Sequence, residues 1–480
     1  MLNKSNSANT ADATAILSSS SVYHFGLLKK EFFLLAYFSV FIGSASALWY
    51  PEQSLWLYLG VSFVIFNLGH IFLTARRYII LPGLMTFIAS VSLIIAPWFA
   101  YSFPATTRIF NMSVPPDQYF SFAVPATIAL WLGAHLTISS GIKGNVVIPE
   151  RLPLSSQEQK VMDALIVAGV TLSTISNYIP SGLGFFIYIL SLLRFVGALS
   201  WMFTNTSGWQ KRIILVYSHL LLLAAGGGLF YEFILWSGYL LISIAWLRQW
   251  RMKLFLTLAV AFCIATFLNG IKSDYRSLIG KEHIDNVQKV QLLGSLLWGS
   301  ISSANETFSN TKTGDRVVRF NQGWIIARIL KRVPDSEPYA AGETVVSAIV
   351  ASIVPRFLVP GKLKAGSKEL FKRYTGLELS SNTSMALGIA GEMYANFGMM
   401  GGVVAIFAYG LFVGWLISLF AYKARTNILW YAWLPFSLLC VMEAEWNLVD
   451  ILNTLVKSII VMLLLMTVFR RSKIRLFHYK

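Results

Sequence analysis

The stretch FGMMGGVVAIFAYGLFVGWLISLFA, residues 397–421, contains no charged side chain. A helix needs about 20 mostly apolar residues to cross the hydrocarbon of a bilayer, which is about 30 Å thick. Every backbone amide in lipid has to be hydrogen-bonded within the protein, so a helix is the form that this stretch can take there. The chain is therefore expected to span a membrane at this point.

The same apolar character recurs along the chain and predicts an all-α, polytopic membrane protein with about twelve transmembrane helices. The stretches are 31–49, 54–73, 78–100, 119–141, 161–178, 182–203, 212–229, 231–248, 253–270, 397–421, 429–447 and 451–469. Composition agrees, because 56% of the residues are hydrophobic and only 13% are charged, with a mean hydropathy of +0.62. Soluble domains are typically about a quarter charged. The weakest separation lies within 212–248, where Gly226–Gly228 and Glu232 mark a break.

The distribution of positive charge predicts the orientation. Twenty Lys and Arg residues fall on the side of the helices that holds both termini, whereas the short loops opposite carry only Arg108. Cytoplasmic loops carry this excess in membrane proteins, so both termini are predicted to be cytoplasmic. A soluble protein with a net charge of +17 would be a candidate for nucleic-acid binding. Here the charge is interpreted as setting the topology, and no nucleic-acid partner is expected.

One long loop interrupts the alternation of helices. The predicted organisation is a disordered cytoplasmic tail at 1–26, nine helices within 27–270, an extracytoplasmic loop at 271–396, three helices within 397–469 and a basic cytoplasmic tail at 470–480. Loops longer than about 15 residues are usually functional or disordered. This one has apolar patterns at 324–330 and 345–354, which predict short helices lying at the membrane surface or dipping into it.

The loop is also basic, which points to an anionic partner. Arg276, Arg319, Arg356 and Lys362 are candidates to bind a lipid-linked phosphate or pyrophosphate, because guanidinium groups hold phosphate oxygens bidentately. The alternative, strongest for the lysines of 362–372, is attraction to anionic lipid headgroups. Up to Met385 the loop holds 16 Lys and Arg against 10 Asp and Glu.

Arg194 lies well inside the sixth predicted helix, between Leu193 and Phe195. An arginine at the centre of a membrane helix costs about 2.5–3.5 kcal/mol on insertion scales, which makes it a functional candidate. The alternatives are snorkelling to the membrane surface or a structural pair with an acid.

A second set of charges lies near the ends of the last two helices on the extracytoplasmic side. Lys457 is interpreted as a structural partner of Glu443 or Glu445, and Asp450 lies close by in the sequence. Glu232 opens the eighth predicted helix from the same side.

The segment GEMYANFG, 391–398, places an acid, a phenol and an amide at the start of the tenth helix. Glu392, Tyr394 and Asn396 are spaced by two, so they would alternate between faces of a helix unless a kink brings two of them together. The neighbouring glycines permit close approach of other backbone. The alternative is a helix cap with an interfacial aromatic.

Motifs for nucleotide, zinc or calcium binding are not found in the sequence. The six histidines are scattered, and only His283 lies in the long loop. Cys263 and Cys440 both lie in apolar runs, which indicates buried free thiols. We therefore expect neither a metal nor another cofactor.

Four segments carry a resemblance to a known family. They are KSDYR at 272–276, AGET at 341–344, IVPRFLVPGK at 353–362 and GEMYANFG at 391–398. With the predicted layout of helices, the chain resembles the bacterial O-antigen and exopolysaccharide repeat-unit polymerases of the Wzy type. The resemblance implies a glycosyltransferase-C-like membrane fold in the bacterial inner membrane, with its active site facing the exterior.

The resemblance also implies a substrate and partners. The growing glycan, carried on undecaprenyl pyrophosphate, would be transferred to a hydroxyl of a fresh lipid-linked repeat unit, alongside a flippase and a chain-length regulator. Charge that develops on the leaving pyrophosphate needs cationic donors, and the acceptor hydroxyl needs a base. As a hypothesis, Arg276, Arg319 and Arg356 hold pyrophosphate, Glu343 or Glu392 serves the acceptor, and Tyr394 and Asn396 contact sugar.

Three other functions stay open at this stage. An O-antigen ligase-like transferase would share the layout and would use a histidine in the loop, for which His283 is available. A lipid-glycan transporter predicts polar residues spread through many helices and pseudo-symmetric halves, which the sequence does not show. A structural scaffold does not explain Arg194.

Overall fold

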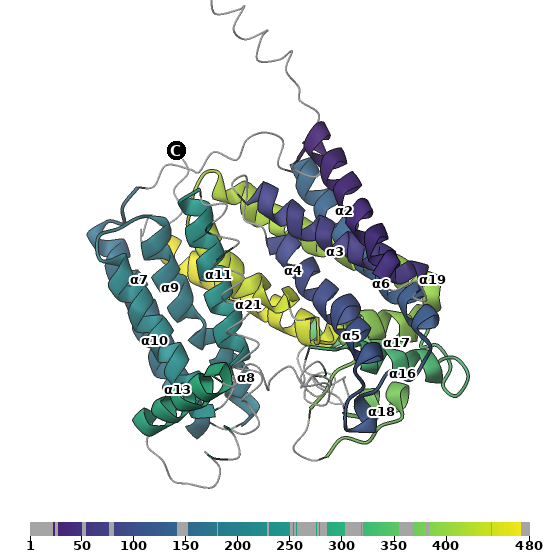
Figure 1. The fold of residues 1–480 in the computed structure, drawn as a ribbon. Helices are drawn as coiled ribbons and strands as arrows, with labels where there is room; N and C mark the ends of the chain where they lie inside the picture. The colour runs from purple at the N-terminus through teal and green to yellow at the C-terminus, as the bar shows by residue number, and fades with distance from the viewer. Residues whose placement is uncertain are drawn as a thin grey trace, which may run out of the picture.

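The computed structural model describes residues 23–24, 27–49, 54–75, 81–141, 152–179, 181–227, 230–249, 253, 256, 275, 278, 286–302, 318, 320–354, 368–380, 384–442 and 444–471. These residues are overwhelmingly helical (Figure 1). The described strands are the two-residue β1 (Tyr23–His24) and β2 (Leu27–Leu28), which pair antiparallel. The prediction of an all-α chain is thus confirmed.

The helices follow the predicted apolar stretches closely. They are α2 (Lys29–Trp49), α3 (Leu55–Thr74), α4 (Leu81–Ser90), η1 (Val91–Ile95), α5 (Ala96–Ser102), η2 (Arg108–Phe110), α6 (Pro116–Gly141), α7 (Ser156–Ile175), η3 (Ser176–Tyr178), α8 (Ser181–Ser191), α9 (Leu193–Phe203), α10 (Trp209–Gly227), α11 (Tyr231–Leu247), α13 (Asn286–Ser302), α16 (Gly323–Arg332), α17 (Glu343–Ile353), α18 (Lys368–Thr375), α19 (Gly388–Ala424), α20 (Trp430–Leu438), η4 (Leu439–Met442) and α21 (Leu448–Arg471).

Within the part of the chain that the structure describes, six helical segments are long and apolar enough to cross a membrane. They are Leu55–Thr74, Leu81–Ser102, Pro116–Thr137, Leu183–Phe203, Gly388–Ala424 and Leu448–Phe469. Such a set is expected of a protein embedded in a membrane with several crossings. The total of about twelve spans and the orientation of the chain remain predictions. The ninth predicted span, 253–270, lies outside the described residues except for Lys253 and Leu256.

The structure differs from the sequence-based expectation at two helix boundaries. The sixth predicted helix is divided at Leu192 into α8 and α9, for a reason that lies in Arg194 and is given below. The tenth predicted helix, 397–421, is preceded within α19 by a further helical segment that starts at Gly388, and the two meet at a kink at Gly398, whose φ is 70° and whose backbone is not helical. Residues 388–396 therefore belong to a helix and not to the loop.

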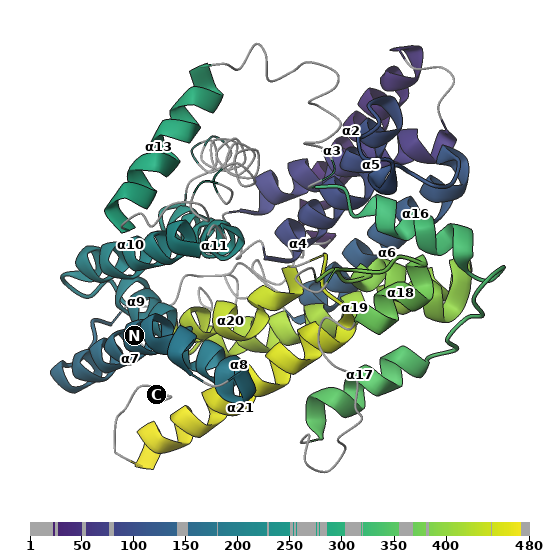
Figure 2. The ribbon, with the colours of Figure 1, turned by 90° about the horizontal axis from the view of Figure 1, so that it is seen from below.

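Two groups of helices make up the molecule (Figures 1 and 2). Helices α2 to α6 pack with α19, whereas α7 to α11 form a second group that also holds α13. Helix α20 contacts both α9 and α19, and α21 runs against α8 on one side and α17 on the other. The C-terminal helices thus connect the two groups.

The long loop contains helices of its own, α13, α16, α17 and α18. The apolar patterns at 324–330 and 345–354 lie in α16 and α17, respectively, so the expectation of short helices here is confirmed. Helix α16 packs on α18 and α19, and α17 packs on α21. These contacts place α16, α17 and α18 against the last helices, whereas α13 packs on α10.

The most extensive helix contact, between α6 and α19, depends on glycine. Gly410 and Gly414 lie one turn apart on α19, where Gly410 faces Gly133 of α6 and Gly414 faces Ala134 and Thr137. A Cβ on Gly410 would lie 2.7 Å from the carbonyl oxygen of Leu130, and one on Gly414 would lie 2.3 Å from that of Ala134. Small residues at this spacing let two membrane helices approach backbone to backbone.

We expect Gly410→Ala to lower the free energy of unfolding by about 1–3 kcal/mol, the usual cost of overpacking, because the new methyl group would meet backbone. Gly238→Ala in α11 is the matched control, since a Cβ there meets nothing within 4 Å. The measurement is the thermal unfolding midpoint of each purified variant in detergent. Equal midpoints for the two variants would contradict the close crossing.

Candidate functional site

A buried carboxylate joins three helices at one end of the molecule. Glu392, on α19, has no exposed surface, and both of its carboxylate oxygens accept hydrogen bonds. The hydroxyl of Thr344 on α17 donates to Oε1 at 2.8 Å, and the backbone N–H of Leu448 at the start of α21 donates to Oε2 at 2.8 Å. A carboxylate at a helix N-terminus is electrostatically favoured.

Asn396 completes this network from the next turn of α19. Its amide nitrogen donates to the hydroxyl of Thr344 and to the carbonyl oxygen of Glu392, both at 2.7 Å. Its side-chain oxygen accepts from the N–H of Gly342 at 3.1 Å. Residues four apart share a helix face, so Glu392 and Asn396 meet at Thr344, while Tyr394 points elsewhere and lies edge-on to the ring of Phe122.

Glu343, the other predicted acid, lies at the surface. Its carboxylate pairs with Arg373 of α18 at 3.1 Å, and the same guanidinium binds Glu337 at 2.6 Å. The pKa of Arg373 is raised above its ordinary value, first by the hydrogen bond to Glu337 and then by that to Glu343. The backbone carbonyl of Arg373 also accepts from Arg332 of α16. These contacts tie the helices of the long loop together.

Arg194 is almost completely buried and occupies the break between α8 and α9. Its Nη1 donates to the carbonyl oxygens of Ser191 at 3.1 Å and Gly169 at 3.5 Å, and its guanidinium lies 4.7 Å from the ring centre of Phe195. At the break, the N–H of Phe195 donates to Leu192, which leaves the carbonyl of Ser191 to accept from Arg194, and α7 supplies the second acceptor through Gly169. Glu232 is close enough to interact with Arg194 electrostatically.

Several predicted site residues lie outside the described residues. They are Arg276, His283, Arg319, Arg356, Lys362 and Glu443. Among the described charges, Lys457 donates to Asn453 at 3.1 Å and lies 4.5 Å from the ring centre of Phe185.

A cavity of about 470 Å³ opens beside the buried network. Four separate parts of the chain form it: η2, the start of α16, the segment before α19 and the segment that leads into α21. Its lining consists of Phe110, Val318, Asn321, Gln322, Trp324, Ile325, Ser384, Met385, Ala386, Glu445, Trp446 and Asp450. This volume is within the range of small-ligand pockets, about 300–1,000 Å³.

The polar groups that line this cavity include two carboxylates and two amides. Glu445 and Asp450 contribute carboxylates, and Asn321, which is 1% exposed, has a side-chain oxygen with no hydrogen-bond partner. The side-chain oxygen of Gln322 is likewise buried without a partner. Buried acceptors favour a ligand that brings donors. Trp324 adds a broad apolar surface.

The buried network holds the walls of the cavity in place. Glu392 fixes the first turn of α21, where Asp450 lies, through the N–H of Leu448. Asn447 accepts from the N–H of Leu387 at 2.8 Å and so joins the segment before α19 to the start of α21. Glu392 and Asn396 are thus positioning residues for the cavity and do not line it.

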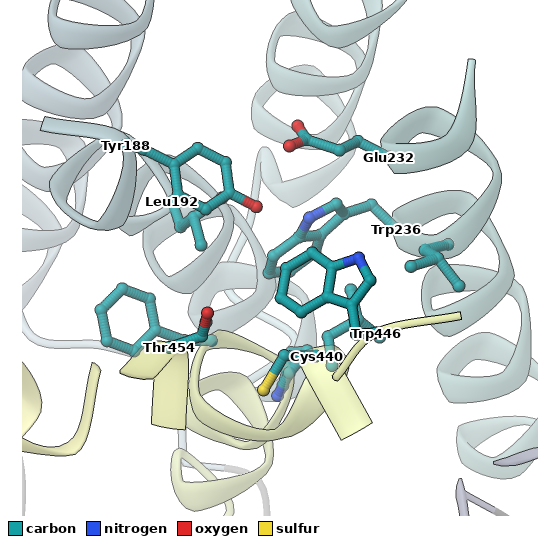
Figure 3. Close-up of a pocket in the computed structure, with 11 residues that line it drawn as sticks. Tyr188, Leu192, Glu232, Trp236, Cys440, Trp446 and Thr454 are labelled. Carbon is teal, nitrogen blue, oxygen red and sulfur yellow. The ribbon is translucent and has the colours of Figure 1, made fainter. Parts of the chain in front are cut away.

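A second, much smaller cavity lies between the second group of helices and the C-terminal helices α20 and α21 (Figure 3). Tyr188 of α8, Glu232 and Trp236 of α11 and Thr454 of α21 surround it together with Trp446. Its volume of about 20 Å³ is enough for a single water molecule. Trp446 lines both cavities, so its ring forms the boundary between them.

Sequence reasoning did not assign Asn321, Trp324 or Trp446 to a site, and it interpreted Glu445 as one of two structural partners for Lys457. The position of these residues in the sequence could have indicated a site, because polar and aromatic residues directly before an apolar helix lie at its end. Among the described residues, no three His, Cys, Asp or Glu side chains gather as a metal site.

Comparisons of the chain with protein-family models, with curated proteins and with solved structures found no match.

We expect Glu392→Ala to destabilise the protein by about 2–3 kcal/mol, because it leaves the Thr344 hydroxyl and the Leu448 N–H buried without their acceptor. Glu343→Gln is the control. Its side chain is 60% exposed, and exposed ion pairs contribute about 0–1 kcal/mol. Thermal unfolding in detergent compares the two, and a midpoint for Glu392→Ala no lower than that for Glu343→Gln would refute the role of the network.

Proposed function

We propose that the protein is a membrane glycosyltransferase that polymerises oligosaccharide repeat units carried on undecaprenyl pyrophosphate. The product would be an O-antigen, capsule or exopolysaccharide made at the outer face of the bacterial inner membrane. The observation that carries this proposal is the 470 Å³ cavity, with its carboxylates, unpartnered amide oxygens and tryptophans at the ends of apolar helices.

The chemistry of the cavity suits a carbohydrate. A sugar is rich in hydroxyl groups, which suit the carboxylates of Glu445 and Asp450 and the polar side chains that line the cavity with them. Sugar rings also have apolar C–H faces, which pack against aromatic rings such as that of Trp324. Because the cavity lies at the starts of α19 and α21, a glycan anchored in the membrane by its lipid could reach it without leaving the bilayer.

The proposed transfer forms one bond and breaks one. The acceptor hydroxyl oxygen bonds to the anomeric carbon of the donor glycan as the bond from that carbon to the pyrophosphate oxygen breaks. The hydroxyl proton passes to a carboxylate, and the lipid pyrophosphate leaves with the bonding electrons. Asp450 or Glu445 is placed to accept the proton, because both carboxylates line the cavity.

The leaving pyrophosphate needs positive charge nearby. The family resemblance implies that Arg276, Arg319 and Arg356 bind the pyrophosphate. In the sequence these residues lie before or after the described helices of the loop. Among the described residues, α16 and α18 contribute further cations, Arg328, Lys331 and Lys368. Preorganised cations in a site that excludes water stabilise developing negative charge.

A ligase-like transferase is the alternative within this reaction class. It would use the same donor and cavity but a different acceptor, so the product separates the two. A purified-protein assay with a lipid-linked repeat unit as both donor and acceptor would yield a ladder for a polymerase and no extension for a ligase.

We expect Asp450→Asn to lower transfer about 10²–10⁴-fold if Asp450 is the general base. Asp450→Asn keeps the size and shape of the side chain, and comparison at matched protein level separates a loss of transfer from a loss of folding. Glu445→Gln is the parallel variant, and Glu378→Gln, an exposed residue that follows α18, is the control. The readout is polymer length at matched protein level. Full-length polymer from both Asp450→Asn and Glu445→Gln would exclude these acids as the base.

We expect Arg356→Ala to shorten or abolish the polymer and Arg356→Lys to retain part of it, because the lysine keeps the charge but loses the bidentate geometry. The same in vivo polymer assay checks this. A normal distribution of chain lengths for Arg356→Ala would remove this arginine from the pyrophosphate site.

A further inference from the structure

Helix α17 has two faces of different character. Its buried side chains are small, namely Thr344, Ala348, Ala351 and Ser352. Its opposite face consists of Val346, Ile349, Val350 and Ile353, which are 61%, 44%, 38% and 66% exposed. The spacing i, i+3, i+4, i+7 makes them one continuous apolar stripe.

The neighbour of α17 shows at what level this stripe lies. Helix α17 packs along α21, which contains the apolar span Leu448–Phe469, and Figure 2 shows the two helices side by side. They start at the same point, because Thr344 and Leu448 both donate to the carboxylate of Glu392. The apolar stripe of α17 therefore lies at the same depth as the apolar span of α21.

The charges of α17 are arranged as in a helix that enters lipid from one side. Glu343 in the first turn is its only charged residue and is held at the surface by Arg373. From Thr344 to Ile353 no side chain is charged. Eleven residues span about 16 Å, roughly half the thickness of the hydrocarbon.

The exposed surface of α21 continues the same chemistry. Ile460, Leu463 and Leu464 are each at least half exposed and lie farther along the helix that α17 partly covers. Exposing the four aliphatic side chains of the α17 stripe to water would be unfavourable, at roughly 25 cal/mol for each Å² of apolar surface. Acyl chains remove that cost.

We propose that α17 is a half-helix inserted into the bilayer, with Val346, Ile349, Val350 and Ile353 in contact with lipid acyl chains. The inference does not depend on the proposed enzymatic function. It assigns to the long loop a segment that is immersed beside α21 and anchored at the surface by the pair of Glu343 and Arg373.

The test measures what surrounds each position of the full-length protein in liposomes. Single cysteines replace Val346, Ile349, Val350 and Ile353 in a background with Cys263→Ser and Cys440→Ala, and each carries a nitroxide spin label. Collision with oxygen reports lipid, and collision with the water-soluble reagent NiEDDA reports solvent. Controls are Glu343→Cys for water, Ile460→Cys for lipid and Ala348→Cys for a protein-covered position.

We expect oxygen collisions to exceed NiEDDA collisions at all four positions, as at Ile460, with the largest ratio at Ile353. A NiEDDA preference would place the stripe in water and overturn the proposal. Protection from both reagents, as at Ala348, would mean that a second copy or another protein covers α17, which overturns it equally.

A second measurement needs no substitution. Lipids with a diazirine in the acyl chain are photoactivated around the unmodified protein, and the labelled residues are mapped by mass spectrometry. Label is expected on the apolar stripe of α17 at a level similar to that on Ile460 to Leu464 of α21. Label on the α21 residues without any on α17 would refute the insertion.

Discussion

The carboxylate of Glu392 is the point on which the arrangement of the last helices depends. It has no contact with solvent, and its two oxygens accept from a hydroxyl on α17 and from the first backbone amide of α21. A buried charge is tolerated only when its hydrogen-bonding capacity is met. The three helices therefore have to meet at this point, and Asn396 closes the remaining gap with Thr344 and Gly342.

The position of the larger cavity follows from this constraint. The helix start that Glu392 holds carries Asp450, and the amide of Asn447 brings the segment before α19 against it. Helix α19 is in turn fixed on α6 where their glycines cross, because the two backbones there are too close for a larger side chain to lie between them. The cavity is thus lined by parts of the chain that are far apart in sequence but held by short, buried contacts.

The helices could be predicted from the sequence, and the site could be predicted only in part. Uncharged runs such as 397–421 are sufficient to locate helices, and the glycines at 226–228 separated α10 from α11 correctly. Helical spacing also indicated that Glu392 and Tyr394 would face different ways. The division at Leu192 was not predictable, because no proline or glycine marks it and its cause is the demand of Arg194 for carbonyl oxygens. The cavity was missed since Phe110, Asn321, Ala386 and Trp446 meet only through tertiary packing.

The burial of Arg194 against a carbonyl of the preceding helix has a consequence for how the chain is inserted during synthesis. One of its two acceptors, the carbonyl of Gly169, belongs to α7, and a Cβ on Gly169 would lie 2.5 Å from the backbone nitrogen of Arg194. Ribosomes deliver α7 before α9, so the acceptor is already present when the arginine leaves the insertion machinery. A guanidinium that faced lipid alone would be expelled or would drag water with it. The position of Arg194 in the membrane therefore depends on the helix that precedes it in the chain, because α7 supplies one of its two acceptors.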